Sequence, residues 1–368
     1  MARIRKHRDK WQVLYRDPET KRERSKGVFA RKSDATDALR KLEYELLSGE
    51  WIDPTLQMTP YREWAATWLE TKSHLTPKTV EGYESLLNSR ILPRFGSVSL
   101  RDIRSIEIER WIAAMHKEGL SASRIRQAHS VLLGTLAAAV RSRMLSSNPA
   151  AGVSLPRPTR NEMLFLTPEQ VELLAKALPR THRAMVYTLA YTGIREGEAT
   201  ALRRRKVNLL QREIIIDESA TDVHGRKVFG ETKNRQTRIA ALPAFLAEML
   251  EAHLEHISAE PDALLFTTSK GGPIDWSNFR TRVWRPAVAA AGLDPKLRIH
   301  DLRHTAASIL IAQGCHAKVV QEHLGHSSIV ITMDRYGHLY PEDRSKVSDA
   351  LDAAFLGGQE AAGYRFAN

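Results

Sequence analysis

Residues 300–336 read HDLRHTAASILIAQGCHAKVVQEHLGHSSIVITMDRY, and this stretch decides what the C-terminal half of the chain can be. It contains His300, Arg303, His326 and Tyr336 but no carboxylate cluster and no second cysteine. Protein-bound zinc and magnesium generally need such ligands. The stretch therefore predicts a site made of cations and one phenol, and no metal site.

Apolar residues in the first part of this stretch recur at helical spacing. Leu302, Ala306, Ile309 and Leu310 form a stripe that predicts the buried face of a helix, and Gly314 predicts its end. His300 and Arg303 lie one turn apart at the start of that helix, so both can face one oxyanion.

The remainder of the stretch predicts two more short helices. AKVVQEHL, residues 317–324, forms the second, and the turn at Gly325 places His326 after it. SSIVITMDRYGH, residues 327–338, forms the third and presents Tyr336.

A second polar cluster lies upstream in YTGIREGEATALRRRKV, residues 191–207. Gly193 predicts a turn, Arg195 follows it directly, and Glu198 comes one helical turn later. A guanidinium fork suits the paired oxygens of a phosphate. The alternative is that Arg195 and Glu198 are only a surface ion pair.

A third candidate lies in ETKNRQTRIAAL, residues 231–242, which continues a hairpin predicted from residue 223 onward. Lys233 falls at the predicted tip, where its amine could reach a leaving oxygen. Lys227 lies on the same hairpin and is the alternative lysine, but the TKN context favours Lys233.

These groups suit the breakage of a phosphodiester without metal, which needs a nucleophile, cationic hydrogen-bond donors and an acid for the leaving oxygen. Tyr336 can be the nucleophile. A phenol of pKa about 10 is roughly 0.1% ionised at pH 7, so the phenolate costs about 4 kcal/mol. We expect the surrounding arginine and histidine residues to lower the pKa of Tyr336.

The 368 residues exceed what one hydrophobic core usually holds, so the chain is expected to be multi-domain α+β. The order of patterns predicts a small three-stranded sheet plus helix, then a domain of four helices, then a mixed, mainly α domain with a small antiparallel sheet. A Pro-rich segment over 148–160 predicts a linker. The predicted domains cover residues 1–56, 57–158 and 159–368.

The charge distribution favours a polyanionic partner. The formal net charge is +12, and the first 32 residues carry 12 Lys and Arg against 4 Asp and Glu.

The single cysteine, Cys315, excludes an internal disulfide and a cysteine-based zinc site, and is expected to be a small core residue on a helix. No apolar run suits a membrane span or a secretory signal, so a cytoplasmic location is expected.

The ordered set TGIREGEATAL, TKNRQTRIAALP, HDLRH, LGH and MDRY resembles the tyrosine site-specific recombinases, and among them the phage integrases. The resemblance implies that Tyr336 attacks the scissile phosphate to form a 3′-phosphotyrosyl link. It further implies that Arg195 and Arg303 bind the non-bridging oxygens and that His326 donates a hydrogen bond to one of them. By the same resemblance, His300 helps accept the tyrosine proton and Lys233 protonates the leaving 5′ oxygen. Glu198 supports the site.

The resemblance also implies partners. Residues 1–56 would bind arm sites and residues 57–158 core sites on double-stranded DNA, and four copies would exchange strands through a Holliday junction, with no cofactor and no metal. A host DNA-bending protein and a phage excision factor are implied as accessory factors. The apolar face of Val347, Leu351, Ala354 and Phe355 predicts a C-terminal helix that docks on a neighbouring subunit or packs on its own domain.

Four other kinds of protein remain as alternatives. An architectural DNA-binding protein would explain the charge but has no use for Tyr336 among arginines and histidines. A metal nuclease would need acidic ligands for Mg²⁺. A type IB topoisomerase shares the chemistry but does not need the N-terminal unit, and a chromosomal dimer-resolving recombinase does not need the first 55 residues.

Overall fold

The structure is a computed structural model that describes residues 2–18, 20–48, 51–158, 162–232, 237–340 and 344–362. Its contacts divide the chain into two units, Met1–Arg160 and Asn161–Asn368, and each is described by itself. The first unit contains two separate hydrophobic cores, one between the N-terminal sheet and its helix and one among the helices that follow. The predicted domain boundaries at residues 56 and 158 stay predictions.

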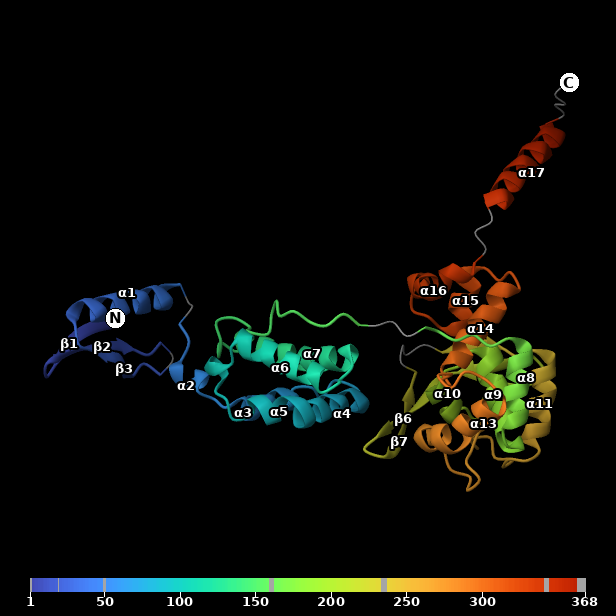
Figure 1. The fold of residues 1–368 in the computed structure, drawn as a ribbon, viewed down its shortest axis with the longest axis horizontal. Coiled ribbons are helices and arrows are strands. Elements are labelled where there is room, and N and C mark those ends of the chain that lie inside the picture. Colours follow the sequence, from blue (N-terminus) through green and yellow to red (C-terminus); the bar gives the residue numbers. More distant parts are fainter. Residues whose placement is uncertain are drawn as a thin grey trace. The chain divides into compact units, whose positions relative to one another are not determined.

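The N-terminal part is an antiparallel sheet in the order β1-β2-β3 with one helix against it (Figure 1). Val13 and Tyr15 are two residues apart on β2 and so lie on the same face of the sheet, in a core with Leu42 and Trp51. The prediction of a three-stranded sheet plus helix is confirmed. The elements are β1 (Ala2–His7), β2 (Lys10–Arg16), β3 (Glu23–Phe29) and α1 (Lys32–Leu47).

The helical part buries a core that includes Tyr61, whose hydroxyl lies 2.7 Å from the Thr135 hydroxyl. The helical stretch that begins at Pro77 is interrupted by a π-helical turn, Leu87–Ile91, just before Pro93. Proline has no N–H for a regular helical bond, which explains the interruption. The helices are α2 (Pro54–Gln57), α3 (Tyr61–Glu70), α4 (Pro77–Leu86), α5 (Leu92–Phe95), α6 (Ser105–Lys117) and α7 (Ala122–Arg141).

The second unit packs helices around two small sheets, one of order β4-β5-β8 and one made of β6 and β7. Its largest core lies among α8, α9, α11 and the start of α14. The strands are β4 (Val207–Asn208), β5 (Glu213–Ile216), β6 (Glu218–Val223), β7 (Arg226–Glu231) and β8 (Arg238–Ala241). The helices are α8 (Pro168–Ala177), α9 (Arg180–Thr192), α10 (Glu196–Ala201), α11 (Ala244–Leu254), α12 (Trp276–Phe279), α13 (Arg285–Ala290), α14 (Asp301–Ala312), α15 (Ala317–Leu324), α16 (Ile329–Tyr336) and α17 (Arg344–Ala362).

The predicted hairpin is corrected. Its turn lies at His224 and Gly225, whose φ angles of 47° and 75° suit a tight two-residue hairpin turn between β6 and β7. The next strand, β8, pairs with β5 and not with β7. Lys233, predicted at the tip, falls outside the described residues.

Helices α14, α15 and α16 follow the order predicted for residues 300–336 (Figure 1). The predicted stripe on α14 is partly wrong, because Ile309 and Leu310 are only half-buried and Ile311 is buried instead. Cys315 is half-buried in the turn after the helix and not on it. α14 is covered on every side at its start, since residues 301–307 are all buried.

The predicted C-terminal helix is α17, where Leu351, Phe355 and Leu356 are 66%, 60% and 58% exposed. Among the residues that the structure describes, no helix combines the length and the apolar character that a bilayer span requires.

Candidate active site

Tyr336 ends α16 inside a cluster of apolar side chains and is 0% exposed. The helix begins after Ser328, whose hydroxyl accepts a hydrogen bond from the Val330 amide. The Tyr336 hydroxyl lies 2.8 Å from Nδ1 of His304 on α14. The third predicted helix and its tyrosine thus lie directly against the first.

Arg303 is buried beside it, at 3% exposure, and is held by two backbone carbonyls. Its Nη1 donates to Gly193 O and its Nη2 to Leu324 O, both at 2.5 Å. Gly193 has φ of 63°, and a Cβ there would lie 2.5 Å from a methyl carbon of Leu324. Glycine therefore suits this position, because it adopts the left-handed conformation freely and leaves room for Leu324.

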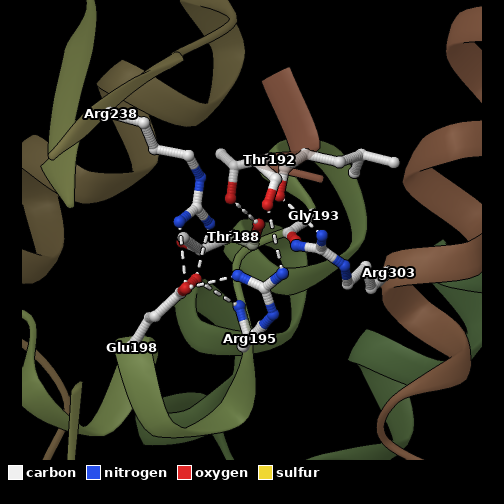
Figure 2. A network of polar contacts seen from close by, with 9 residues as sticks. Thr188, Thr192, Gly193, Arg195, Glu198, Arg238 and Arg303 are labelled. Carbon is white, nitrogen blue, oxygen red and sulfur yellow. Dashed lines mark hydrogen bonds and ion pairs between the residues drawn. The ribbon is translucent and has the colours of Figure 1, made fainter. Parts of the chain in front are cut away.

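Glu198 joins two further arginines (Figure 2). Its Oε1 accepts from Arg195 Nη1 at 2.8 Å and from Arg238 Nη1 at 2.9 Å, and its Oε2 accepts from Arg238 Nη2 at 2.5 Å and from the Arg195 amide at 2.8 Å. Burial would raise the pKa of Glu198, but the hydrogen bonds and charges of Arg238 and Arg195 lower it to about 2. Because Glu198 is 3% exposed, the alternative of a surface ion pair is wrong.

One short segment connects these groups. Leu324 O accepts from Arg303, Gly325 O accepts from Arg195 Nη2 at 3.2 Å, and His326 follows. The His326 ring stacks on Tyr336 with centroids 6.2 Å apart and planes at 12°. The turn at Gly325 therefore brings two arginines, a histidine and the tyrosine together.

The three histidines near Tyr336, which are His300, His304 and His326, are neutral at pH 7. Burial, then nearby cations, lower the pKa of His326 to about 3 and of His300 to about 4, and burial, then His300, lowers that of His304 to about 4. His326 Nδ1 lies 2.9 Å from Thr332 Oγ1, and its buried Nε2 has no hydrogen-bond partner among the described residues. The unpaired Nε2 can serve a ligand oxygen.

Residues 164–343 match the phage integrase family, and residues 61–116 match the N-terminal SAM-like domain of phage integrases. The chain belongs to the phage integrase family. This integrase is 28% identical over 338 residues to the prophage phiRv2 integrase of Mycobacterium tuberculosis, covering 89% of this chain and 88% of that one. The integrase of Mycobacterium phage L5 is 28% identical over 272 residues, 72% of each chain.

Solved structures show the same fold. The Tn1549 transposon integrase in complex with transposon right end DNA has a TM-score of 0.68 at 18% identity, over 81% of this chain and all of that one. A lambda integrase dimer bound to a core site has a TM-score of 0.60 at 20% identity, over 91% and 93%. The integrase is accordingly a tyrosine site-specific recombinase, an enzyme that cuts and rejoins DNA, and the topoisomerase, nuclease and architectural alternatives are set aside.

The expected lowering of the Tyr336 pKa is not found in this integrase. Burial raises the pKa of Tyr336 above its ordinary value, although the charges of Arg303 and Arg335 act in the opposite direction. The histidines contribute no positive charge because burial keeps them neutral. The phenol is therefore protonated at pH 7 and needs a group that takes its proton during attack.

The structure adds two residues that the sequence analysis did not single out, Arg238 and His304. Both were within quoted motifs, but only the fold shows their partners. Lys227 pairs with Asp222 at 2.7 Å on the β6–β7 hairpin.

Proposed function

We propose that Tyr336 of this recombinase attacks the scissile phosphorus, forming a 3′-phosphotyrosyl link and releasing a 5′-hydroxyl. One observation carries the proposal. The consecutive carbonyls of Leu324 and Gly325 hold Arg303 and Arg195, and the next residue, His326, stacks on Tyr336. Arg195 and Arg303 are far apart in sequence, so this convergence is a property of the folded unit.

The two arginines bind the non-bridging oxygens. Each guanidinium has five N–H donors in a rigid fork, and the carbonyl and carboxylate contacts fix its direction while leaving donors for a phosphate. Glu198 supports the site by fixing Arg195. When His326 Nδ1 accepts from the Thr332 hydroxyl, Nε2 carries the ring proton and donates a hydrogen bond to one of the same two oxygens.

Two protons must move in the reaction. Lys233 protonates the leaving 5′ oxygen, and His300 assists the transfer of the Tyr336 proton to its acceptor. The phosphotyrosyl link keeps the energy of the phosphodiester, so rejoining to another 5′-hydroxyl needs neither ATP nor a metal ion.

The N-terminal sheet binds arm-type DNA sites. Arg5, Gln12 and Ser25 are joined side chain to side chain across all three strands, by contacts of 2.9 and 3.0 Å. The exposed side chain of Arg3, two residues before Arg5 on the same face of β1, extends this polar surface. Its affinity should fall steeply with salt, because phosphate contacts release counterions.

The helical domain binds the core sites, and the active form is a tetramer that exchanges strands through a Holliday junction on DNA in the bacterial cytoplasm.

α17 docks on the neighbouring subunit through its exposed face of Leu351, Phe355 and Leu356. A chain truncated after Tyr340 should then sediment on DNA as smaller species; an intact tetramer would refute this role. A host DNA-bending protein and a phage excision factor set the direction of the reaction.

Covalent capture tests the proposed chemistry. Nicked duplexes with random cores are incubated with the protein in EDTA, and denaturant-resistant complexes are sequenced to define a core-site duplex. Wild type should form adducts whose DNA has a blocked 3′ end and a free 5′-hydroxyl, whereas Tyr336→Phe should form none. Adducts with a blocked 5′ end would contradict the proposal.

A second assay separates recombination from simple relaxation of supercoils. Plasmids that carry the captured site should yield recombinants only when two sites are present. Relaxation without strand exchange under all conditions would favour topoisomerase activity instead.

A further inference from the structure

Nδ1 of His304 lies 2.8 Å from the Tyr336 hydroxyl, which also has a side-chain hydrogen bond with Arg335. An arginine stays protonated in proteins and has no acceptor, so of these two partners only His304 can take the phenol proton. His304 is 4% exposed and Tyr336 is 0% exposed, so no bulk water competes for the phenol proton. The ring of His300, in contrast, packs edge-on against His304, with centroids 5.1 Å apart and planes at 87°. In the described contacts, His300 reaches the tyrosine only through His304.

The fold fixes His304 from several sides. The start of α14 is anchored by Thr305, whose hydroxyl donates to Asp301 O at 2.9 Å and accepts from the Leu166 amide at 3.1 Å. The ring of Phe165 contacts His304 with centroids 6.4 Å apart. The imidazole therefore keeps its direction toward Tyr336 without support from DNA.

Titratable and charged groups surround His304 from three parts of the fold. Asp301 lies on α14, and Arg298 and His300 lie in the turn before it. Arg335 and Tyr336 lie on α16, and His326 lies in the turn after α15. Their combined effect and burial keep the His304 ring neutral at pH 7, so one ring nitrogen is an acceptor. A DNA phosphate that enters beside them brings negative charge, which favours the protonated imidazole in the transition state.

We propose that His304 is a catalytic residue that accepts the Tyr336 proton on Nδ1 as the phenol oxygen attacks phosphorus. The proposal rests on the proposed role of Tyr336. The phenol O–H bond breaks and the proton goes to Nδ1, the new O–P bond forms, and the bond to the 5′ oxygen breaks as that oxygen takes a proton from the general acid. In rejoining, the imidazolium returns its proton to the tyrosine oxygen. His300 supports the ring that it packs against.

The rate of adduct formation on the captured nicked duplex, measured in single turnover with the full chain from pH 6 to 9.5, tests this role. His304→Asn keeps an oxygen near the Nδ1 position but cannot take the proton. It should slow cleavage by about 10² to 10⁴, the usual contribution of a general base, and its rate should rise about tenfold per pH unit. His300→Asn, which removes only the ring that supports His304, should be slower than wild type but keep the wild-type shape of the pH profile.

A bridging 5′-phosphorothiolate substrate distinguishes a base from an acid, because a thiolate leaves without protonation. The defect of His304→Asn should persist on this substrate, while that of Lys233→Ala should be largely removed. Removal of the His304→Asn defect by the sulfur substrate would overturn the proposal.

Three other results would also overturn it: unchanged or faster cleavage by His304→Asn, loss of rate with the wild-type pH profile, or a hydroxide-dependent profile in His300→Asn instead. If His304→Asn does not fold, as judged by its thermal transition, the ¹⁵N shift of His304 Nδ1 in wild type decides. A protonated Nδ1 at pH 7 contradicts the role, and an unprotonated one supports it. Adduct formation by Tyr336→Phe would instead refute the proposed function itself.

Discussion

Replacement of Glu198 by glutamine should destabilise the C-terminal unit strongly. The carboxylate is 3% exposed, accepts four hydrogen bonds from Arg195 and Arg238, and has its pKa lowered from 4.5 to about 2. A difference of about 2.5 pKa units corresponds to about 3 kcal/mol of stability, similar to the 3–5 kcal/mol lost when one partner of a buried ion pair is removed. Glutamine also turns an N–H donor toward an arginine donor.

The pH dependence of this stability has a definite direction. Because the pKa of Glu198 is lower in the folded state, its contribution is fully present above about pH 4.5 and is lost as the pH falls toward 2. The stability difference between wild type and Glu198→Gln should therefore shrink over this range.

Calorimetry of the full chain, with the transition of the C-terminal unit resolved, measures the effect. Glu218→Gln is a matched control, since Glu218 also pairs with an arginine, Arg203 at 3.0 Å, but the two side chains are 30% and 24% exposed. The control should lose less than about 1 kcal/mol. Equal losses in the two variants, or a loss below about 1 kcal/mol in Glu198→Gln, would refute the reasoning.

Three further predictions concern the same unit. Arg303→Lys should lower the rate of adduct formation by about 10² to 10³ with little change in DNA affinity, because it removes fixed oxyanion donors; a rate within threefold of wild type would contradict this. Gly193→Ala should lower the free energy of unfolding by about 2 to 4 kcal/mol, because alanine is strained in the left-handed conformation and its Cβ overlaps Leu324. Gly119 also has a left-handed conformation but open space around it, so Gly119→Ala should lower the free energy of unfolding by only about 1 to 2 kcal/mol. Lys233→Ala should slow cleavage strongly, whereas Lys227→Ala, which only breaks a pair with Asp222, should cleave at nearly the wild-type rate; the reverse order would reassign the acid.

The helices of the site could be predicted from sequence because their signals are local. Gly314 and Gly325 have φ angles of 78° and 68°, and they end α14 and α15 where the residue pattern indicated. Arg303 and Tyr336 could be singled out because an arginine and a tyrosine among histidines have few structural explanations.

Other features depended on long-range packing. Arg238 reaches Glu198 only because β8 pairs with β5, a sheet order that no local pattern encodes. The burial of His304 could not be predicted, because an amphipathic pattern predicts one buried face of a helix. The start of α14 is buried on all sides. The pKa of Tyr336 was predicted in the wrong direction because the depth of burial is a property of the fold.

The central claim is that the Tyr336 oxygen becomes bonded to DNA. Mass spectrometry of the trypsin-digested adduct tests it most directly, with one caution: the peptide 336–344 contains both Tyr336 and Tyr340. Fragment ions must therefore separate the two. We predict a nucleotide 3′-phosphate on Tyr336 alone; a nucleotide on Tyr340 or on any other residue would contradict this claim.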